Sequence, residues 1–565
     1  MRDRSISALR TLRPEVDAGI FWFRDDLHQP VPISAMGMTT VQKHHAWGYH
    51  VAAKETNLPP SKGAYVKIYK GRVYLGFALI QDENLVAERA KEFGKFVKYC
   101  RENWSKFYNG YIDEVKAGLA VMRNFDAASA SWSALLEHVR KADDINRRNW
   151  EIHFILMYPA DTLYLECEAY CQRLGLEEKD FVTILQGFDS MPAKTDEAIW
   201  KLALRAQELG FTELLKNTSG ENVRAALETR PEAAPWLQEF DAFLEVYGNR
   251  INAAHLDVLF PTWREDPVPV IDTIRSYFQR MEDGWDFYRA REAVYRERDK
   301  AIQNFEKRLD DKGLAQFREM LAIGQKVYAY QEDHGFYIDQ GSTAGLHDVL
   351  MGAGRRLQQI GLLKRAEDVF FLTFNELVEV LADLSRDEEI AVYHHDALVP
   401  QLIEERKQSW EEAKSDDAPL TLGNVPKTMT DPIAIKVFGI IDEVLHPKGE
   451  KIVAERLTGF AGSAGITEGR ARVVTDFEDF SNVQAGEILV APYTGTAWTP
   501  LFLKIRGVVT DTGGMLTHAA IAAREYGIPA VVGTWNATNS IRNGDIIRID
   551  GSAGVVEILQ RAKAE

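Results

Sequence analysis

The sequence predicts an α+β protein of several domains: a large α-rich domain with one small β-hairpin, a linker, and a compact α/β domain. The chain has 565 residues, more than one hydrophobic core normally holds. Apolar residues follow a helical period through most of residues 1–410, whereas residues 441–565 alternate short β-branched runs with glycine turns. We therefore expect an α-rich domain at 1–410, a linker at 411–440 and an α/β domain at 441–565.

Most elements of the α-rich domain are expected to be long helices. Its exception is Tyr65–Phe77, where two alternating apolar and polar runs meet at Lys70-Gly71 and predict a β-hairpin. The amphipathic patterns that predict helices lie at 83–121, 127–173, 196–215, 232–253, 270–310, 313–333, 343–362 and 374–384.

The expected linker is marked by a change in composition. Residues Glu411–Pro432 read EEAKSDDAPLTLGNVPKTMTDP and show no helical period. About 20 such residues extend to at most roughly 70 Å, so we expect the following domain to be able to travel.

The bulk composition excludes several classes of protein. A formal net charge of −17, with no basic stripe to offset it, argues against nucleic acid as a partner. The three cysteines form no disulfide framework, and the bland interpretation is a reducing compartment. No apolar run approaches the ~18 residues that span a bilayer, so we expect a soluble cytoplasmic protein without membrane contact.

One histidine, His518, lies in an unusual local pattern. Gly513 and Gly514 permit a tight turn after the strand-like run Gly507–Thr510, and an alanine-rich helix is predicted to begin at His518. The first turn of a helix presents free N–H groups and the positive end of the dipole, which suits a phosphoryl group on the imidazole. By itself, such a histidine is equally typical of a helix cap or a core.

Two neighbours of His518 are candidates for binding the phosphoryl oxygens. Thr517 offers a hydroxyl donor. Arg524 offers a guanidinium that can neutralise phosphoryl oxygens or pair with an acid on the domain surface. The predicted phosphoryl-binding set is therefore Gly513, Gly514, Thr517 and Arg524 around the catalytic His518.

The segment Thr510–Val532, TDTGGMLTHAAIAAREYGIPAVV, resembles the phosphohistidine site of the phosphoenolpyruvate-utilising enzymes. Gly459–Val474 resembles the first strand pair of their mobile domain, Gly486–Phe502 its central strand and turn, and Asn543–Leu559 its closing hairpin. Leu516 stands where the synthase and dikinase members carry threonine, and leucine there is more typical of the branch that phosphorylates alcohols and phenols.

The α-rich domain resembles the acceptor-binding domain of rifampin-phosphotransferase-like proteins in Phe21–Pro32, Tyr247–Pro267 and Gly354–Leu381. The candidate acceptor-binding residues are Arg24, Asp26 and His28 in the first of these segments, and Asp333 and His334 in the run QEDHGFYIDQ. The paired histidines His44-His45 and His394-His395 lack a second ligand cluster at metal spacing, so we expect no metal bound by this chain.

The resemblance also implies a division of labour. No segment looks like an ATP-grasp nucleotide domain, and the chain most resembles the histidine-bearing subunits of phenylphosphate synthases. What this implies is that a separate ATP-grasp subunit, with ATP and Mg²⁺, places the β-phosphoryl of ATP on His518, and that a phenol or other alcohol then accepts it. Neutral imidazole is a competent nucleophile and leaving group for this relay. The alternatives are a phosphocarrier that passes phosphoryl groups between proteins, or a component of an antibiotic phosphotransferase.

Overall fold

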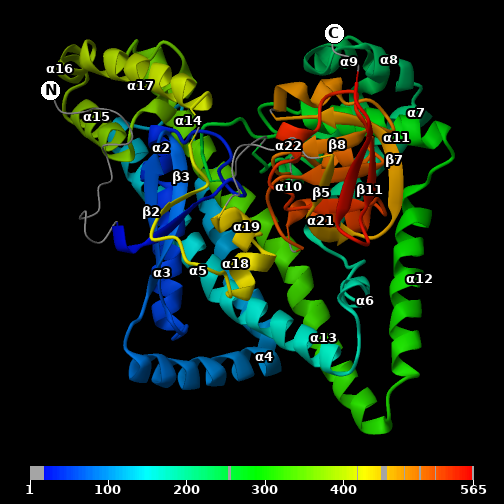
Figure 1. The fold of residues 1–565 in the computed structure, drawn as a ribbon. Coiled ribbons are helices and arrows are strands. Elements are labelled where there is room, and N and C mark those ends of the chain that lie inside the picture. Colours follow the sequence, from blue (N-terminus) through cyan, green and yellow to red (C-terminus); the bar gives the residue numbers. More distant parts are fainter. Residues whose placement is uncertain are drawn as a thin grey trace. The chain divides into compact units, whose positions relative to one another are not determined.

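The computed structural model describes residues 18–251, 256–416, 418–446, 455–475, 477–495, 498–515 and 517–562. The protein is a multidomain α+β structure, as predicted (Figure 1). It divides into two compact units, each built from separate stretches of the chain. The first unit comprises Met1–Thr162, Asn249–Pro261 and Asp333–Val425; the second comprises Leu163–Gly248, Thr262–Glu332 and Pro426–Glu565.

The first unit contains a four-stranded antiparallel sheet in the order β2-β3-β1-β4. The predicted hairpin is confirmed as β2 (Ser61–Tyr69) and β3 (Arg72–Leu79). Its turn uses Lys70 and Gly71 with φ of 50° and 71°. Two successive positive φ values match the right-handed twist of the paired strands, which explains the glycine. The other strands are β1 (Phe21–Arg24) and β4 (Thr421–Gly423).

Helices and short helical turns form the rest of the first unit around one apolar core. Asp82 caps α4 (Glu83–Arg123) by accepting hydrogen bonds from the backbone N–H groups of Asn84 and Leu85. These elements are α2 (Ala35–Thr39), α3 (Val41–Glu55), α4 (Glu83–Arg123), α5 (Trp132–Arg173) as far as Thr162, the π-helix η4 (Gly335–Gln340), α14 (Gly341–Gln359), η5 (Ala366–Phe371), α15 (Phe374–Arg386), α16 (Glu388–His395) and α17 (Leu398–Lys414).

The segment predicted as a linker, 411–440, contains regular structure and contributes to both units. Helix α17 continues to Lys414, β4 pairs with β1, and the Arg24 N–H donates to Leu420 O at 2.8 Å. Helix α18 (Pro432–Lys436) belongs to the second unit. This corrects the expectation of an irregular tether, because a strand of three residues is held by backbone pairing and leaves no periodic pattern.

The helical part of the second unit packs around its own aromatic core. Ser190 caps α7 by accepting from the backbone N–H of Ala193. The elements are α6 (Glu178–Thr183), α7 (Met191–Glu208), α8 (Thr212–Asn217), η2 (Gly220–Asn222), α9 (Val223–Glu228), η3 (Pro231–Ala233), α10 (Ala234–Tyr247), α11 (Val268–Glu282), α12 (Phe287–Glu306) and α13 (Asp311–His334) as far as Glu332. The two-unit division differs from the predicted single domain at 1–410, because helical periodicity does not reveal which helices share a core.

The second unit also holds a β-sheet (Figure 1). This sheet has eight strands in the order β5-β12-β11-β7-β8-β9-β10-β6. The strands are β5 (Arg456–Thr458), β6 (Phe460–Ser463), β7 (Ile466–Val473), β8 (Ile488–Ala491), β9 (Gly507–Thr510), β10 (Ala530–Val532), β11 (Ile546–Asp550) and β12 (Val555–Gln560). Strands β7 to β10 run parallel. The closing hairpin β11–β12 is confirmed. The expected first strand pair is wrong as a pairing, since β6 pairs with β10 and β7 pairs with β8 and β11.

Alternation along the parallel strands buries both faces of this sheet. Leu489 and Val508 face a core that includes residues of α20 (Thr499–Phe502) and α21 (His518–Glu525). Val490 and Val509 face a second core that includes Ala537 of α22 (Ala537–Ser540). The strands therefore lie between helices on both sides, in agreement with the predicted α/β character of residues 441–565. The described part also includes the short helices η6 (Phe477–Asn482) and α19 (Asp442–Leu445).

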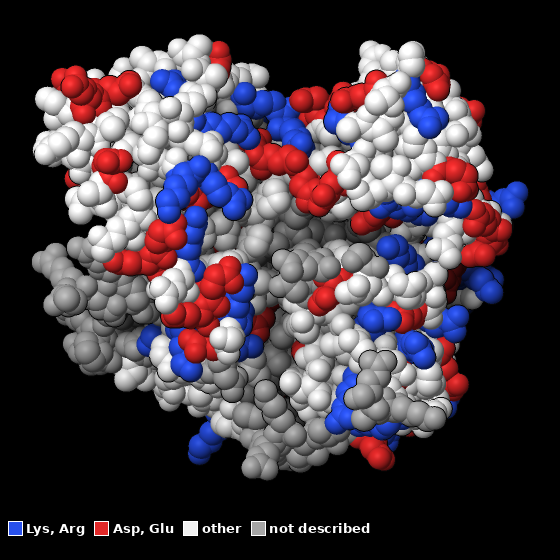
Figure 2. All heavy atoms as spheres, turned by 90° about the horizontal axis from the view of Figure 1, so that it is seen from above, with Lys and Arg blue, Asp and Glu red and all other residues white. Residues whose placement is uncertain are grey.

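Among the described residues, no helix combines the length and apolar character that crossing a bilayer requires. On the face drawn in Figure 2, lysine and arginine side chains are interspersed with aspartate and glutamate.

Candidate functional site

His518 is the first residue of α21 in the second unit, as predicted. It follows the loop after β9, and the loops after the parallel strands β8 and β10 adjoin that loop: the Asp511 N–H donates to Ala491 O, and the Thr534 N–H donates to Thr510 O, both at 3.0 Å. His518 therefore lies at the carboxyl edge of the parallel strands, where α/β sheets usually bind ligands.

The imidazole of His518 is half-buried and oriented by a residue that the sequence did not single out. The Thr494 hydroxyl lies 3.0 Å from Nδ1 of His518. The Phe502 ring meets the imidazole edge to face, with centroids 5.6 Å apart. Thr494 follows β8 in the run GEILVAPYTGTAWTPLF. The available signal was a hydroxyl side chain just after a buried parallel strand.

The loop before His518 requires its two glycines. Gly513 has a φ of +100°, and a Cβ there would lie 2.8 Å from Cγ2 of Thr517. A Cβ on Gly514 would lie 2.2 Å from the backbone oxygen of Lys436, at the end of α18. The chain around α18 therefore packs backbone against backbone on this loop. Leu516 lies outside the described residues.

The hydroxyl of Thr517 makes a hydrogen bond within the loop before α21. Its side chain is buried, and its hydroxyl donates to Gly514 O at 2.7 Å. This bond closes the turn that leads into α21, so Thr517 shapes the loop. A direct role in phosphoryl binding stays a prediction.

Arg524 is unusual because its guanidinium is buried and its two terminal nitrogens lack hydrogen-bond partners among the described residues, although the carboxylate of Glu525 is near enough to interact with its charge. The residue is 7% exposed, and neither Nη1 nor Nη2 has a hydrogen-bond partner among the described residues. Burying a cation whose N–H groups lack hydrogen bonds is costly, and an anion such as a phosphoryl group would offset that cost. Arg524 lies on the same helix as His518, roughly 9 Å further along its axis at 1.5 Å per residue. Its predicted role therefore fits the structure and stays untested.

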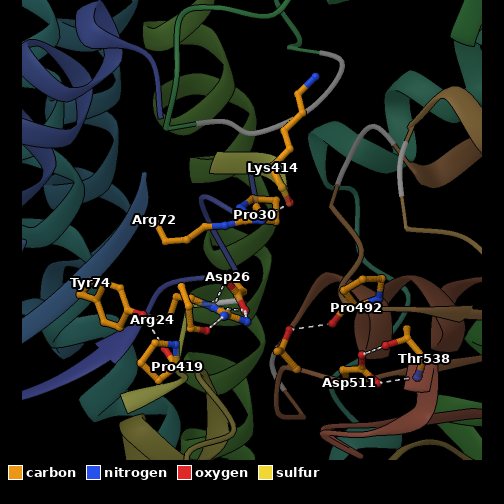
Figure 3. A network of polar contacts seen from close by, with 12 residues as sticks. Arg24, Asp26, Pro30, Arg72, Tyr74, Lys414, Pro419, Pro492, Asp511 and Thr538 are labelled. Atoms are coloured by element: carbon orange, nitrogen blue, oxygen red, sulfur yellow. Dashed lines mark hydrogen bonds and ion pairs between the residues drawn. The ribbon is translucent and has the colours of Figure 1, made fainter. Parts of the chain in front are cut away.

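Further polar contacts brace the framework of the site. The Asp511 carboxylate accepts from the backbone N–H of Thr538 at 3.0 Å and from the Thr538 hydroxyl (Figure 3). The Thr512 hydroxyl donates to Pro492 O at 2.9 Å. At the other end of α21, the Tyr526 hydroxyl donates to Asp196 at 2.6 Å. Both ends of the His518 segment are thus fixed within the second unit.

The acceptor candidates lie in the first unit, where Arg24 and Asp26 bind each other. Nε of Arg24 lies 2.8 Å from Oδ1 of Asp26 and its Nη2 lies 2.6 Å from Oδ2 (Figure 3). Nη1 of Arg24 donates to Ala418 O. Burial raises the pKa of Asp26 and Arg24 only partly counters this. This pair therefore ties β1 to the segment before β4, a role that accounts for both residues without a ligand.

His28 is held by a different carboxylate. Its Nδ1 lies 2.8 Å from Oδ1 of Asp25, and the two rings of His28 and His45 have centroids 5.8 Å apart. Burial lowers the pKa of His28, but the carboxylates of Asp25 and Asp339 outweigh burial and the net pKa is raised. An imidazole oriented by a buried carboxylate is the arrangement of a general acid or base.

His334 and His28 both interact with the carboxylate of Asp339. Nε2 of His334 lies 3.5 Å from Oδ2 of Asp339, the carboxylate that also acts on His28. Asp333 precedes His334 at the end of α13. The first unit thus separates the predicted candidates into an Arg24–Asp26 brace and a histidine–carboxylate group.

Comparison with known proteins identifies the class. Residues 483–554 match the family described as PEP-utilising enzyme, mobile domain. Residues 153–332 match the family described as rifampicin phosphotransferase fourth domain. Together with the phosphohistidine-type loop, these matches identify residues 483–554 as a mobile domain of the PEP-utilising enzyme family and relate residues 153–332 to rifampicin phosphotransferases.

Individual relatives agree with this assignment. An uncharacterized phosphotransferase of Bacillus subtilis, YvkC, is 30% identical over 431 residues, covering 76% of this chain and 49% of the relative. The rifampicin phosphotransferase of Bacillus cereus is 31% identical over 359 residues, covering 61% and 36%. Phosphoenolpyruvate synthase of Aeropyrum pernix is 41% identical over 116 residues, covering 20% and 14%. The chain thus spans half or less of the length of each of these relatives.

Proposed function

We propose that this protein is a phosphotransferase component that carries a phosphoryl group on His518 and delivers it to the hydroxyl of a phenol or other aromatic alcohol. The observation that supports it most is the position of His518, at the start of α21 with its ring oriented by Thr494. Relatives named phosphotransferases support the reaction class.

The geometry suggests how the imidazole reacts. If Nδ1–H donates to the Thr494 hydroxyl, the lone pair lies on Nε2, which then attacks phosphorus. The new phosphoryl oxygens accept hydrogen bonds from the first N–H groups of α21. Arg524 supplies a buried positive charge whose terminal nitrogens have no hydrogen-bond partner among the described residues. Transfer then depends on positioning and charge neutralisation.

We propose ATP as the phosphoryl source, used with Mg²⁺ at a separate ATP-grasp subunit in the cytoplasm. The β-phosphoryl moves to Nε2 and AMP leaves, while a water molecule takes up the γ-phosphoryl group as phosphate. In the second half-reaction the acceptor oxygen attacks phosphorus and the imidazole leaves. The oriented His28–Asp25 pair in the first unit is a candidate to remove the acceptor proton.

The second half-reaction can be tested without the ATP-using partner. The purified chain, given ³²P-labelled phenylphosphate, should acquire an acid-labile, base-stable label and exchange labelled phenol into phenylphosphate. His518→Ala should abolish both. His395→Gln, which changes a histidine paired with Asp383, should leave both unchanged.

Two results would contradict the proposal. Labelling that persists in His518→Ala would remove the phosphohistidine assignment. Failure of the wild-type chain to exchange with any member of a broad panel of phenols and aromatic alcohols would remove the acceptor class, and would favour the phosphocarrier.

A further inference from the structure

The first unit contains a second group of converging side chains, formed by His153, His334 and Asp339. Nδ1 of His153 lies 2.9 Å from Oδ1 of Asp339, and Nε2 of His334 lies 3.5 Å from Oδ2. The two imidazole rings have centroids 4.9 Å apart. One carboxylate therefore lies between two imidazoles that come from different helices.

A local irregularity of the backbone creates this convergence. His334 ends α13, and Asp339 lies on the π-helix η4 that links α13 to α14. In an α-helix, residues five apart point about 140° away from each other at 3.6 residues per turn. The wider π turn pairs residues five apart and brings both side chains to one side. Short π segments inside helices occur frequently at functional sites.

The group is enclosed by aromatic side chains. His153 is 6% exposed and Asp339 9%. The rings of Trp150 and Phe154 lie 5.0 and 4.4 Å from the His153 ring, centroid to centroid. Such surroundings weaken competition from water for the polar atoms and strengthen electrostatic interactions with a bound cation.

We propose that His153, His334 and Asp339 bind one divalent transition-metal ion, such as Zn²⁺, Mn²⁺ or Co²⁺. One ligand atom from each residue lies within 4.8 Å of the others. With metal–ligand bonds of ~2.0 to 2.2 Å, neighbouring ligand atoms of one ion lie roughly 3.0 to 3.4 Å apart. Each imidazole nitrogen lies at a comparable distance, 2.9 or 3.5 Å, from a different oxygen of the Asp339 carboxylate. Two imidazoles and a carboxylate suit these ions and leave open coordination positions.

This inference deepens the proposed function and rests on it for its role. An ion with open positions would bind the oxygen of the acceptor and polarise it as a Lewis acid. This metal ion is distinct from the Mg²⁺ expected with ATP, because Mg²⁺ prefers oxygen ligands whereas this site offers two imidazole nitrogens. Of this group, the sequence analysis singled out only His334, as an acceptor-binding candidate, because the three side chains lie 181 and 5 residues apart along the chain.

The experiment uses the untagged full chain after removal of metals with EDTA. Zn²⁺ titration by calorimetry should give one site, and Co²⁺ should give visible d–d bands. His153→Gln, His334→Gln and Asp339→Asn should each weaken Zn²⁺ binding by on the order of 100-fold. His395→Gln is the matched control, since its imidazole lies 3.1 Å from Asp383, and it should bind as the wild type does.

Further measurements distinguish loss of metal binding from misfolding and from loss of phosphotransfer. Zn²⁺ should raise the melting temperature of the wild type but not that of the three variants. X-ray absorption of the Zn²⁺-loaded wild type needs no variant and should show two imidazole ligands. His518→Ala should bind Zn²⁺ normally, so a failed phosphotransfer assay leaves this test intact. Wild-type affinity in all three variants, or a spectrum without imidazole ligands, would overturn the metal site.

Discussion

Among single residues of the candidate site, His518 and Arg524 differ in whether their side chains have hydrogen-bond partners. His518 has a hydroxyl on Nδ1, whereas the two terminal nitrogens of Arg524 have no hydrogen-bond partner among the described residues. Residues that orient the nucleophile and residues that await an anion should respond differently to substitution. Two predictions separate them.

The first concerns orientation of the imidazole. Thr494→Val removes the hydroxyl beside Nδ1 at nearly constant volume, so the imidazole loses its preferred tautomer. We expect labelling of His518 by phenylphosphate to slow about tenfold or more, which is ~1.4 kcal/mol, while Thr494→Ser keeps most of the rate. Rapid-quench measurement of the labelling rate checks this; equal rates in Val and Ser variants would show that Thr494 does not orient the ring.

The second concerns the buried guanidinium. Arg524→Gln removes a buried charge whose terminal nitrogens have no hydrogen-bond partner among the described residues, so the free energy of unfolding should stay the same or rise by ~1 kcal/mol. The same change should slow phosphorylation of His518 about tenfold or more. Urea unfolding and labelling rates measure the two effects. A large loss of stability with normal labelling would make Arg524 a structural residue.

At the scale of elements, two segments are held by close backbone contacts and buried polar groups. The loop before α21 admits no side chain at Gly514, because Lys436 O occupies that space. The start of α2 depends on Asp257, which accepts from the backbone N–H of Ser34 at 2.7 Å and from its hydroxyl at 2.5 Å.

We expect Gly514→Ala to displace α18 or the loop, and to lower the stability of the second unit by ~1 to 3 kcal/mol. Labelling of His518 should fall as well. Gly110→Ala is the control: a Cβ there meets nothing within 4 Å, and alanine favours a helix interior, so stability should stay or rise. Thermal denaturation compares the two; similar melting temperatures would show that the contact yields easily.

The Asp257 carboxyl gives a pH dependence of defined sign. Burial raises its pKa from 3.8 to about 6, although the Ser34 hydroxyl opposes this. The folded protein therefore keeps a proton between pH 3.8 and 6 that the unfolded chain releases, and this contribution to stability is lost as pH rises through that window. The loss totals roughly 3 kcal/mol. Asp257→Asn should remove this slope in urea unfolding at pH 4 to 7; an unchanged slope would contradict the assignment.

At the scale of the whole molecule, the segment 411–440 decides how the chain connects its units. Because β4 completes the first sheet, deletion of residues 418–423 should destabilise the first unit by several kcal/mol, through the loss of backbone pairing and the Arg24 contact. Insertion of ten glycine and serine residues after Val425 should cost under ~1 kcal/mol. Calorimetric melting compares them. If the deletion and the insertion lowered stability by equal, small amounts, the whole segment would act as a free linker.

The α/β class of residues 441–565 and the place of His518 at the start of a helix could be predicted from the amino-acid sequence alone. The glycine pair, the alanine-rich helix and the closing hairpin are local patterns, and local patterns are fixed by backbone preferences that a sequence displays directly. Three other contacts became visible only in the folded chain: Thr494 with His518, β6 with β10, and His153 with His334 and Asp339 through the π turn. These contacts join residues that are far apart in the chain, or residues that only an irregular turn brings together. They depend on tertiary packing, which local sequence preferences do not display.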